Sequence, residues 1–390
     1  MATTALEQQL GRQTQATARR PTVAEVDLAA IARNLRRISS RVTPAEIMAV
    51  VKADAYGHGA IPVARTALKA GAGQLAVALL EEGIALRRSS ITTPILVFGG
   101  FDAAQIDAYL QYDLQMTLYD EEVARLVARR ASALGKRALV HVKLDTGMGR
   151  VGIVDNPVER VAQLQGLAGL ELVGCYTHFA TSDEADKTFA RQQLRDFRQI
   201  LAALESQGIA FRWIHAANSG AILDLPESYF NLVRPGIMLY GYYPSPFTSE
   251  SIPLDPAMRL KTRIHFVKQV QAGYSVSYGR TFRTRAPSAI ATLPIGYADG
   301  YRRQFSNNMH VLVRGQRAPV VGRVCMDQTM IDVSDLKEVH TGEEVILLGR
   351  QHNAQIPMKE WCEALTTIPY EVTCGISSRV PRNYIDEFKN

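Results

Sequence analysis

A lysine at the end of an apolar run is the first residue of chemical interest in this sequence. Residues 47–52 read Ile-Met-Ala-Val-Val-Lys, so Lys52 closes a segment that is otherwise hydrophobic. A charged amine is costly to leave unpaired in such surroundings. Either Lys52 extends to water or pairs with an acid such as Asp54, or desolvation and neighbouring cations lower its pKa and suit it to form a Schiff base with a carbonyl cofactor. Cations that could act in this way follow other apolar runs: Lys143, Arg150 and Arg234.

Two turns of small residues could bind a phosphate group. Ser219-Gly220 and Gly236-Ile237 each follow a short apolar run, and their backbone N–H groups and the serine hydroxyl are suitable hydrogen-bond donors. A Schiff-base lysine together with a phosphate site describes pyridoxal phosphate (PLP) better than any other common cofactor.

Other motifs favour less specific interpretations. Residues 147–152 match G-x-G-x-x-G, the dinucleotide-binding pattern, but the next predicted helix begins only several residues later, so the third glycine cannot open it. This argues against a dehydrogenase. His178 and His215 lie at predicted strand ends, and no ligand spacing links them to a metal site. Tyr278, beside a glycine, would ordinarily be a residue that packs in a turn.

The elements that must position these residues alternate between strands and helices. Short apolar runs predict eight strands, at residues 47–52, 75–79, 94–98, 114–118, 138–144, 170–177, 211–216 and 231–234. Longer periodic stretches predict helices, for example at residues 60–70, 121–134, 157–167 and 186–207. Eight such repeats predict an α/β fold, a (β/α)8 TIM-type barrel, with an open doubly wound sheet as the alternative. In a barrel, the loops after the strands converge on one face, where the strand-end residues would meet.

After about residue 254 the predicted helices nearly disappear. Alternating segments predict a mostly-β C-terminal domain, with strands at residues 263–271, 288–294, 310–313, 319–324, 330–333 and 343–348. We therefore expect three parts, namely a disordered lead at residues 1–21, a PLP-binding barrel at residues 22–254 and a β-rich domain at residues 255–390.

Composition excludes several classes of protein. The 390 residues are 47% hydrophobic and 21% charged, as in folded proteins. The net charge of +6 comes from scattered basic pairs, and nucleic-acid binding would favour a basic stripe with interleaved aromatic residues. No apolar run approaches the roughly 20 residues that span a bilayer, and the first residues do not resemble an export signal, so we expect a cytoplasmic protein without membrane contact. Four cysteines without a C-x-x-C pair are expected to be reduced and mostly buried: Cys175, Cys325, Cys362 and Cys374.

Taken together, the motifs resemble those of the alanine racemase family, over nearly all of residues 22–390. They are AVVKADAYGHG at residues 49–59, KLDTGMGR at 143–150, YTHFA at 176–180, HAANS at 215–219, RPGI at 234–237, SYG at 277–279, GYADG at 296–300, CMD at 325–327 and PYE at 369–371. The family's fold is a PLP-binding barrel followed by a β domain. The resemblance implies the interconversion of L-alanine and D-alanine, which supplies D-alanine for cell-wall peptidoglycan.

The resemblance also implies a role for each matching residue. Lys52 would hold PLP as an aldimine and act as one catalytic base, and Tyr278 would be the other base. Further catalytic roles fall to His178, which would support Tyr278, and to Arg150, beside the ring hydroxyl. The other cofactor contacts would come from Tyr56, His215, Asn218, Ser219, Arg234, Gly236, Ile237 and Tyr370. Substrate contacts would come from Arg150, Tyr297, Met326 and Asp327.

The resemblance further implies a homodimer with shared active sites. Each cavity would receive Tyr278, Tyr297 and Met326 from the partner subunit. Lys143 matches a position that is carbamylated in some members of the family, where it orients the neighbouring arginine.

The required chemistry explains these residue types. Racemisation removes the α-proton from one face of the substrate and returns a proton to the other, so two bases must flank it. Arg234 opposite the pyridine nitrogen cannot give up its proton, which leaves the ring a weaker electron sink and limits side reactions. The alternatives are a serine or broad-specificity racemase, a decarboxylase of the same fold, which would need an acid in place of Arg234, and a non-catalytic PLP carrier, which would have no use for Tyr278.

Overall fold

The computed structural model describes residues 20–386 of the chain. They fold into two compact units, and we describe each by itself. The barrel unit contains residues 27–257 and 368–374, and the strand-rich unit contains, among the described residues, 20–26, 258–367 and 375–386. The lead predicted at residues 1–21 falls almost wholly outside the described residues.

Eight parallel strands form the sheet of the barrel unit, in the order β8-β7-β6-β5-β4-β3-β2-β9. Their bounds are β2 (Glu46–Val50), β3 (Gln74–Val77), β4 (Ile95–Val97), β5 (Gln115–Leu118), β6 (Ala138–Lys143), β7 (Leu170–Tyr176), β8 (Trp213–His215) and β9 (Leu232–Val233). Most strand residues are buried, because a parallel sheet is covered by helices on one side and filled by side chains on the other. The predicted barrel is confirmed.

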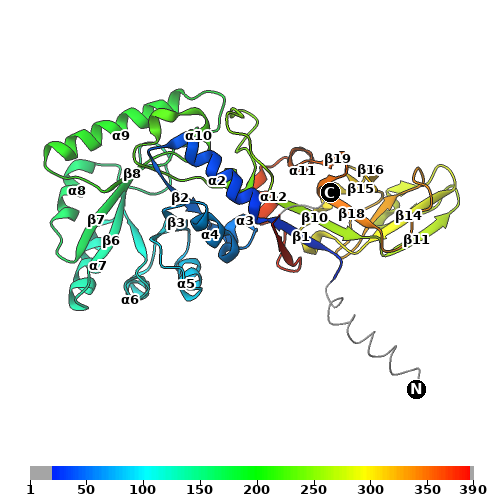
Figure 1. Cartoon of the computed structure of the whole chain (residues 1–390), viewed down its shortest axis with the longest axis horizontal. Coiled ribbons are helices and arrows are strands. Elements are labelled where there is room, and N and C mark those ends of the chain that lie inside the picture. Colours follow the sequence, from blue (N-terminus) through cyan, green and yellow to red (C-terminus); the bar gives the residue numbers. More distant parts are fainter. Residues whose placement is uncertain (1–19, 387–390) are drawn as a thin grey trace, which may run out of the picture. The chain divides into compact units, whose positions relative to one another are not determined.

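Helices follow most strands of the barrel unit, and α7, α8 and α9 run along its outer side (Figure 1). The helices are α2 (Leu28–Val42), α3 (Lys52–Tyr56), α4 (Ala60–Lys69), α5 (Leu80–Arg88), α6 (Ile106–Gln111), α7 (Glu121–Ala133), α8 (Pro157–Gln165), α9 (Thr188–Ser206), α10 (Ser219–Asp224) and α12 (Pro369–Cys374), and α3 is a short left-handed turn. Local signals set their starts: the Asp120 carboxylate accepts the Val123 amide at the start of α7, and Pro157 opens α8.

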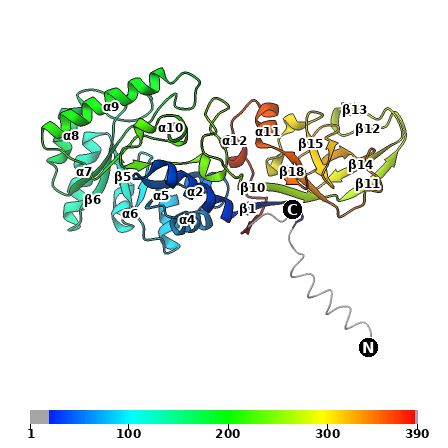
Figure 2. The ribbon, with the colours of Figure 1, turned by 45° about the horizontal axis from the view of Figure 1, so that its top comes forward.

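The strand-rich unit contains a seven-stranded sheet, a three-stranded sheet, β11-β14-β17, and a two-stranded sheet, β12-β13. Its strands are β1 (Val23–Asp27), β10 (Met258–Arg263), β11 (Phe266–Val270), β12 (Ser275–Val276), β13 (Phe282–Arg283), β14 (Ser288–Leu293), β15 (His310–Val313), β16 (Gln316–Pro319), β17 (Thr329–Asp332), β18 (Glu344–Gln351), β19 (Ala354–Ile356) and β20 (Arg382–Ile385). Helix α11 (Met358–Leu365) lies against β18, where the Trp361 indole N–H donates to the Leu347 carbonyl (Figure 2). The predicted mostly-β domain is confirmed.

Two predicted strands of this unit differ from the structure. The segment predicted as one strand at 263–271 is interrupted between β10 and β11. The strand predicted at 319–324 lies earlier, because β15 and β16 form a hairpin that turns at Arg314-Gly315 and pairs His310 with Pro319.

Two short segments belong to a different unit from the one that the sequence indicated. Residues 23–26, which the predicted domain bounds place in the barrel, lie in strand β1, which pairs with β10 in the strand-rich unit. The Glu25 carboxylate stabilises this pairing by contacting Arg259 at 2.6 Å and Lys261 at 2.7 Å. Residues 368–374, predicted in the C-terminal domain, belong to the barrel unit and carry Tyr370 with them.

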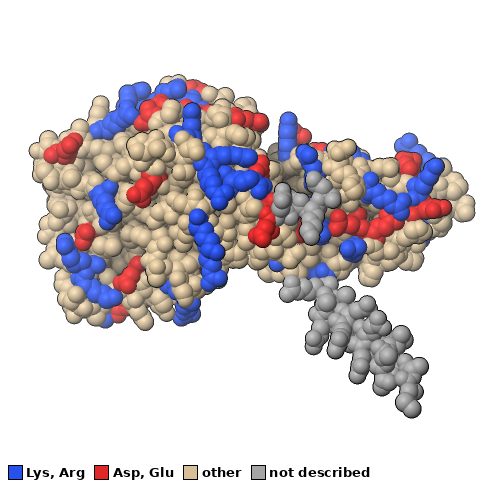
Figure 3. Space-filling model, in the orientation of Figure 1, with Lys and Arg blue, Asp and Glu red and all other residues tan. Residues whose placement is uncertain are grey.

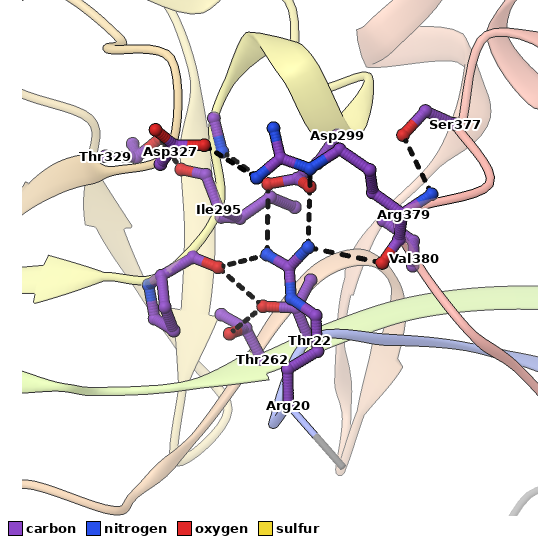
Figure 4. A network of polar contacts seen from close by, with 12 residues as sticks. Arg20, Thr22, Thr262, Ile295, Asp299, Asp327, Thr329, Ser377, Arg379 and Val380 are labelled. Atoms are coloured by element: carbon purple, nitrogen blue, oxygen red, sulfur yellow. Dashed lines mark hydrogen bonds and ion pairs between the residues drawn. The ribbon is translucent and has the colours of Figure 1, made fainter.

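A buried carboxylate organises one side of the strand-rich unit (Figure 4). The Arg20 guanidinium donates to both oxygens of Asp299, at 2.6 and 3.0 Å, and to the Pro294 carbonyl at 2.7 Å. Arg379 also contacts Asp299, at 3.4 Å, and donates to Asp327 at 2.6 Å. The Asp299 side chain is fully buried, so two arginines neutralise one carboxylate here.

Basic and acidic side chains are interspersed over the face drawn in Figure 3. Within residues 20–386, no helix has both the length and the apolarity needed to cross a membrane. The same residues contain no cluster of three or more His, Cys, Asp or Glu side chains suited to a metal ion. All four cysteines are free thiols, but only Cys175 is buried, so the expectation of mostly buried cysteines is wrong.

Candidate active site

A cavity of about 360 Å³ lies where the strands of the barrel unit end. Its walls contain these sequence-predicted residues: Lys52, Tyr56, Lys143, Arg150, His178, Asn218, Ser219, Arg234, Gly236, Ile237 and Tyr370. Basic side chains are well represented, whereas none of the described residues that line it is an aspartate or a glutamate. The cavity is therefore suited to an anionic ligand.

Lys52 lies between β2 and a left-handed turn. Residues Ala53, Asp54, Ala55 and Tyr56 all have φ between 51° and 53°, although none is a glycine. A left-handed helical conformation costs an L-residue roughly 1–2 kcal/mol, so surrounding contacts must stabilise this turn. Such strain beside a reactive side chain is typical of functional sites.

Neighbouring polar groups hold that turn. The Asp54 carboxylate accepts the Ala60 amide at 2.7 Å, at the start of α4, and makes no ion pair with Lys52. The His58 ring Nδ1 lies 3.1 Å from the Ala55 carbonyl and 3.0 Å from the Tyr56 carbonyl. Because both partners accept, Nδ1 carries the proton.

The environment of Lys52 favours a neutral amine. Burial lowers the pKa of Lys52, and the Arg150 and Arg234 charges lower it further, while Glu82 and Cys374 act in the opposite direction. A neutral amine is the nucleophilic form, so this environment is the one that Schiff-base chemistry requires.

Arg234 is a buried arginine that contacts only neutral groups. Its guanidinium donates to the carbonyl oxygens of Thr177 and Ala216, each at 3.0 Å. It also lies 2.9 Å from Nδ1 of His215 and 3.2 Å from Nδ1 of His178. Burial lowers the pKa of Arg234 to about 10, so it is still charged at neutral pH.

A chain of hydrogen bonds extends from Arg234 through the interior of the barrel. His215 Nε2 lies 2.9 Å from His141 Nδ1, and His141 Nε2 lies 3.0 Å from the Gln115 side-chain oxygen. Since Arg234 can only donate, His215 accepts at Nδ1 and donates at Nε2, and His141 repeats this pattern. Burial and the Arg234 charge lower the pKa of His215 well below its usual value and that of His141 to about 3, so both rings are neutral.

His178 is also neutral, and its tautomer follows from the same reasoning. Burial, Arg234 and Lys143 lower its pKa well below the usual value. Its Nδ1 accepts from Arg234, so its proton is on Nε2 and can be donated to another group.

Lys143 is nearly fully buried in the cavity wall. Burial, followed by Arg234 and Arg150, lowers its pKa to about 7. Its amine lies 4.9 Å from the centre of the Tyr176 ring, which also stacks on His215. Two lysines of the cavity, Lys52 and Lys143, thus have lowered pKa values.

The glycine-rich segment at residues 147–152 is not a phosphate loop. The Asp145 carboxylate accepts the amides of Gly147, Met148, Gly149 and Arg150, at 2.7–3.2 Å. Helix α8 begins only at Pro157, as the sequence predicted, so the third glycine does not open a helix as it would in a dinucleotide-binding site. These amides are occupied by the protein's own carboxylate, and the turn places Arg150 at the cavity.

The opposite wall forms a cradle of small and hydroxyl-bearing residues. The Gly236 amide donates to the Ser219 hydroxyl at 2.9 Å, and a side chain at Gly236 would place a Cβ 2.6 Å from the Tyr56 oxygen. The Tyr370 ring lies 5.8 Å from the Tyr56 ring. Asn218 caps α10 and accepts the Ser182 hydroxyl. This donor set, with the cationic opposite wall, fits the phosphate and ring of PLP.

The remaining predicted residues lie in the strand-rich unit and are exposed. Tyr278 is 72% exposed, Met326 52% and Tyr297 39%. Their loops are joined, because the Tyr297 amide donates to the Cys325 carbonyl and the Ser277 hydroxyl to the Arg323 carbonyl. Asp327 follows Met326 and contacts Arg379. His215 contacts Arg234 behind the cavity and is not part of its lining.

Sequence reasoning assigned no role to several residues of the cavity wall. Phe98, Gly99 and Gly100 follow β4, and Tyr176 ends β7. The rule that functional residues follow barrel strands could have found all of them. Gln115 and His141 lie deeper inside the barrel, where no strand-end signal marks them.

The fold and the cavity define a barrel enzyme whose site is suited to an anionic, carbonyl-bearing cofactor held by a lysine. The family model described as "Alanine racemase, N-terminal domain" matches residues 26–244, and "Alanine racemase, C-terminal domain" matches residues 257–384. The chain belongs to the alanine racemase family, whose members are PLP-dependent.

Individual relatives agree over nearly the whole chain. The chain is 48% identical to "Alanine racemase 2" of Caldanaerobacter subterraneus over 369 residues, 94% of this chain and 95% of the relative. It is 49% identical to the alanine racemase of Desulforamulus reducens, over 94% and 99% of the two chains. Among solved structures, alanine racemase of Clostridium difficile 630 has a TM-score of 0.90 at 40% identity, covering 94% and 96%. Alanine racemase from Bartonella henselae "with covalently bound pyridoxal phosphate" has a TM-score of 0.85 at 30% identity, covering 94% and 100%.

Proposed function

We propose that this protein interconverts L-alanine and D-alanine with PLP held at Lys52, and so supplies D-alanine for peptidoglycan. The observation that carries the proposal is a cavity lined by Lys52 and Arg234 without any carboxylate among its described lining residues. Family membership and alanine racemase relatives of nearly equal length support the reaction.

The cofactor would be held by groups on both walls of the cavity. Ser219, Tyr56, Tyr370 and the backbone of Gly236-Ile237 would bind its phosphate, and Arg234 would face its pyridine nitrogen. Bound PLP supplies an electron sink that acidifies the α-C–H bond of an amino acid. Arg234 contacts only neutral groups and remains protonated, so it would donate a hydrogen bond to that nitrogen without giving up its proton.

Lys52 and Tyr278 would be the two bases. Lys52 exchanges the α-proton of D-alanine at its amine, which the surroundings keep readily deprotonated. Tyr278 exchanges the α-proton of L-alanine at its phenol oxygen, and the neutral His178 donates its Nε2 proton to that oxygen when the phenol has lost its own. Arg150 would lie beside the ring hydroxyl, and the backbone of Met326 would hold the substrate carboxylate.

A homodimer with shared active sites would bring these groups together. Tyr278, Tyr297 and Met326 lie on joined loops and expose large apolar surfaces, which is typical of residues that contact a partner. Each protomer would therefore supply them to the cavity of the other. Lys143, with a pKa of about 7, has a large neutral fraction that can add CO2 and release a proton, giving a carbamate beside Arg150. The cytoplasmic location stays a prediction from the sequence.

The test is chiral chromatography of a panel of L-amino acids incubated with purified protein and PLP in deuterated water. We expect L-alanine and D-alanine each to give a near-equal mixture labelled at the α-carbon, because enantiomers have equal free energy. Lys52→Ala should abolish the reaction, and the exposed Lys69→Ala, in the same unit, should leave it unchanged. Faster conversion of serine than of alanine would overturn the substrate assignment, and no conversion of any amino acid would overturn the function.

A further inference from the structure

A side chain outside the cavity holds the strained turn after Lys52. The Glu82 carboxylate lies on α5, and its Oε1 accepts the amide of Ala53, the residue directly after Lys52, at 2.6 Å. Its Oε2 accepts the amides of Ala78 at 2.8 Å and Leu79 at 3.1 Å. Glu82 thus connects the ends of β2 and β3 at the rim of the cavity.

Helix capping accounts for only one of these three contacts. A glutamate at the third position of a helix ordinarily accepts the amide of the residue before the helix, here Leu79. One carboxylate oxygen is enough for that. The other oxygen reaches a different loop, 29 residues earlier in the chain, and the amide that it accepts begins the left-handed turn.

Glu82 also contributes a negative charge near a basic site. The titratable groups that act on Lys52 come from four places: Arg150 after β6, Arg234 after β9, Cys374 at the end of α12 and Glu82 on α5. Glu82 is the largest of the contributions that raise the pKa of Lys52, against burial and Arg150, which lower it.

We propose that Glu82 is a positioning residue of the racemase reaction, which holds the turn at Ala53 so that the Lys52 amine and the Tyr56 hydroxyl keep their places in the cavity. The proposal rests on the proposed function, because it assigns Lys52 the cofactor and one of the two bases. Glu82 need not touch cofactor or substrate, and acts through the backbone on each side of Lys52.

The test separates the effect of the Glu82 side-chain length from the effect of its charge. Glu82→Asp keeps the charge but is too short for both loops. Glu82→Gln keeps the length, but its single amide oxygen cannot accept from both loops, and its NH2 group then faces a backbone N–H. Glu81→Gln is the matched control, since Glu81 is exposed in the same helical turn.

Two readouts apply to each holoenzyme: kcat and KM for D-alanine, and the pH midpoint at which borohydride fixes PLP to Lys52. We expect Glu82→Asp and Glu82→Gln to lose about tenfold in kcat with little change in KM, because a displaced base slows proton transfer. Only Glu82→Gln should move the midpoint to lower pH, by about half a unit, because loss of the negative charge favours the neutral amine. Glu81→Gln should match the wild type in both.

The outcomes distinguish this proposal from the proposed function. Wild-type kcat and midpoint in Glu82→Gln would overturn the positioning role, and so would a lower melting temperature as the only change. If the wild-type protein itself is not labelled at Lys52, the proposed function fails. Should Glu82→Asp not fold, Glu82→Gln provides both readouts alone.

Discussion

Arginines at two sites in this chain have opposite surroundings. In the strand-rich unit, Arg20 and Arg379 share the fully buried Asp299, and Arg379 also contacts Asp327 (Figure 4). In the barrel unit, Arg234 is nearly completely buried and contacts two carbonyl oxygens and two neutral imidazoles. The first arrangement is internally neutral, and the second keeps an uncompensated positive charge.

This difference separates structural charges from functional ones. An unpaired buried charge lowers stability, and such perturbed charges cluster at functional sites. Burial lowers the pKa values of Arg234, Lys52 and Lys143, and the Arg234 charge lowers those of the two lysines further. Asp299 has a pKa lowered by Arg20 and the Gly296 amide, which together outweigh its burial.

The largest effect is expected at Arg234. Arg234→Ala removes the group that we propose to face the pyridine nitrogen, and it also removes the donor that fixes the tautomers of His178 and His215. We expect kcat/KM for alanine to fall by at least about a hundredfold, because a preorganised charge and an oriented catalytic histidine are lost together. Arg36→Ala, at an exposed position on α2, is the control. Near wild-type kinetics for Arg234→Ala would show that the uncompensated charge has no catalytic use.

The next effect concerns stability and not the reaction. Arg20→Ala leaves the buried Asp299 carboxylate with Arg379 and the Gly296 amide as partners, and we expect the free energy of unfolding at pH 7 to fall by about 2 kcal/mol. Urea unfolding of the wild type, of Arg20→Ala and of Arg285→Ala, at an exposed position in the same unit, measures this.

The same pair of proteins tests the pH dependence. The folded-state pKa of Asp299 lies below its usual value of 3.8. The ionised Asp299 carboxylate therefore makes its full contribution to the free energy of unfolding above pH 3.8. That contribution is lost as the pH falls through the folded-state pKa. The difference in the free energy of unfolding between the wild type and Arg20→Ala should be constant from pH 5 to 8 and should shrink below pH 4. A difference that persists at low pH would contradict an ionic origin.

The sequence predicted the barrel and most of its cavity because both follow from strand ends. Lys52, Arg150, His178 and Arg234 each follow an apolar run, and parallel strands bring their carboxyl ends to one face. The sequence did not indicate a role for Glu82, because that role depends on a left-handed turn at residues 53–56. No glycine in these residues marks the turn in the sequence. The chain from His215 to Gln115 depends on side chains from three strands meeting inside the barrel, and residue order does not specify that. Tyr370 was found only through the family resemblance, because α12 joins the barrel unit from more than a hundred residues beyond its last strand.

The smallest effect is expected at Lys143. Its lowered pKa of about 7 means that it is half neutral at pH 7, and the neutral amine reacts with CO2. With ¹³C-bicarbonate, the wild type should show a carbamate NMR signal that grows from pH 6 to 8 and is absent in Lys143→Met. The variant should lose only severalfold in kcat, because Arg150 loses an orienting partner while both bases remain. A carbamate signal that survives in Lys143→Met would assign it to another amine.

The central claim is that the cavity, whose positive charge is not balanced by a carboxylate among its described lining residues, holds PLP through Lys52. Lys143 is the natural competitor, since it lies in the same cavity with a lowered pKa. The most direct measurement is borohydride reduction of the PLP-loaded protein, followed by proteolysis and mass spectrometry of the labelled peptide. The account predicts one pyridoxyl group per chain, attached to Lys52 and absent in Lys52→Ala. A label on Lys143, or a label spread over surface lysines, would contradict it.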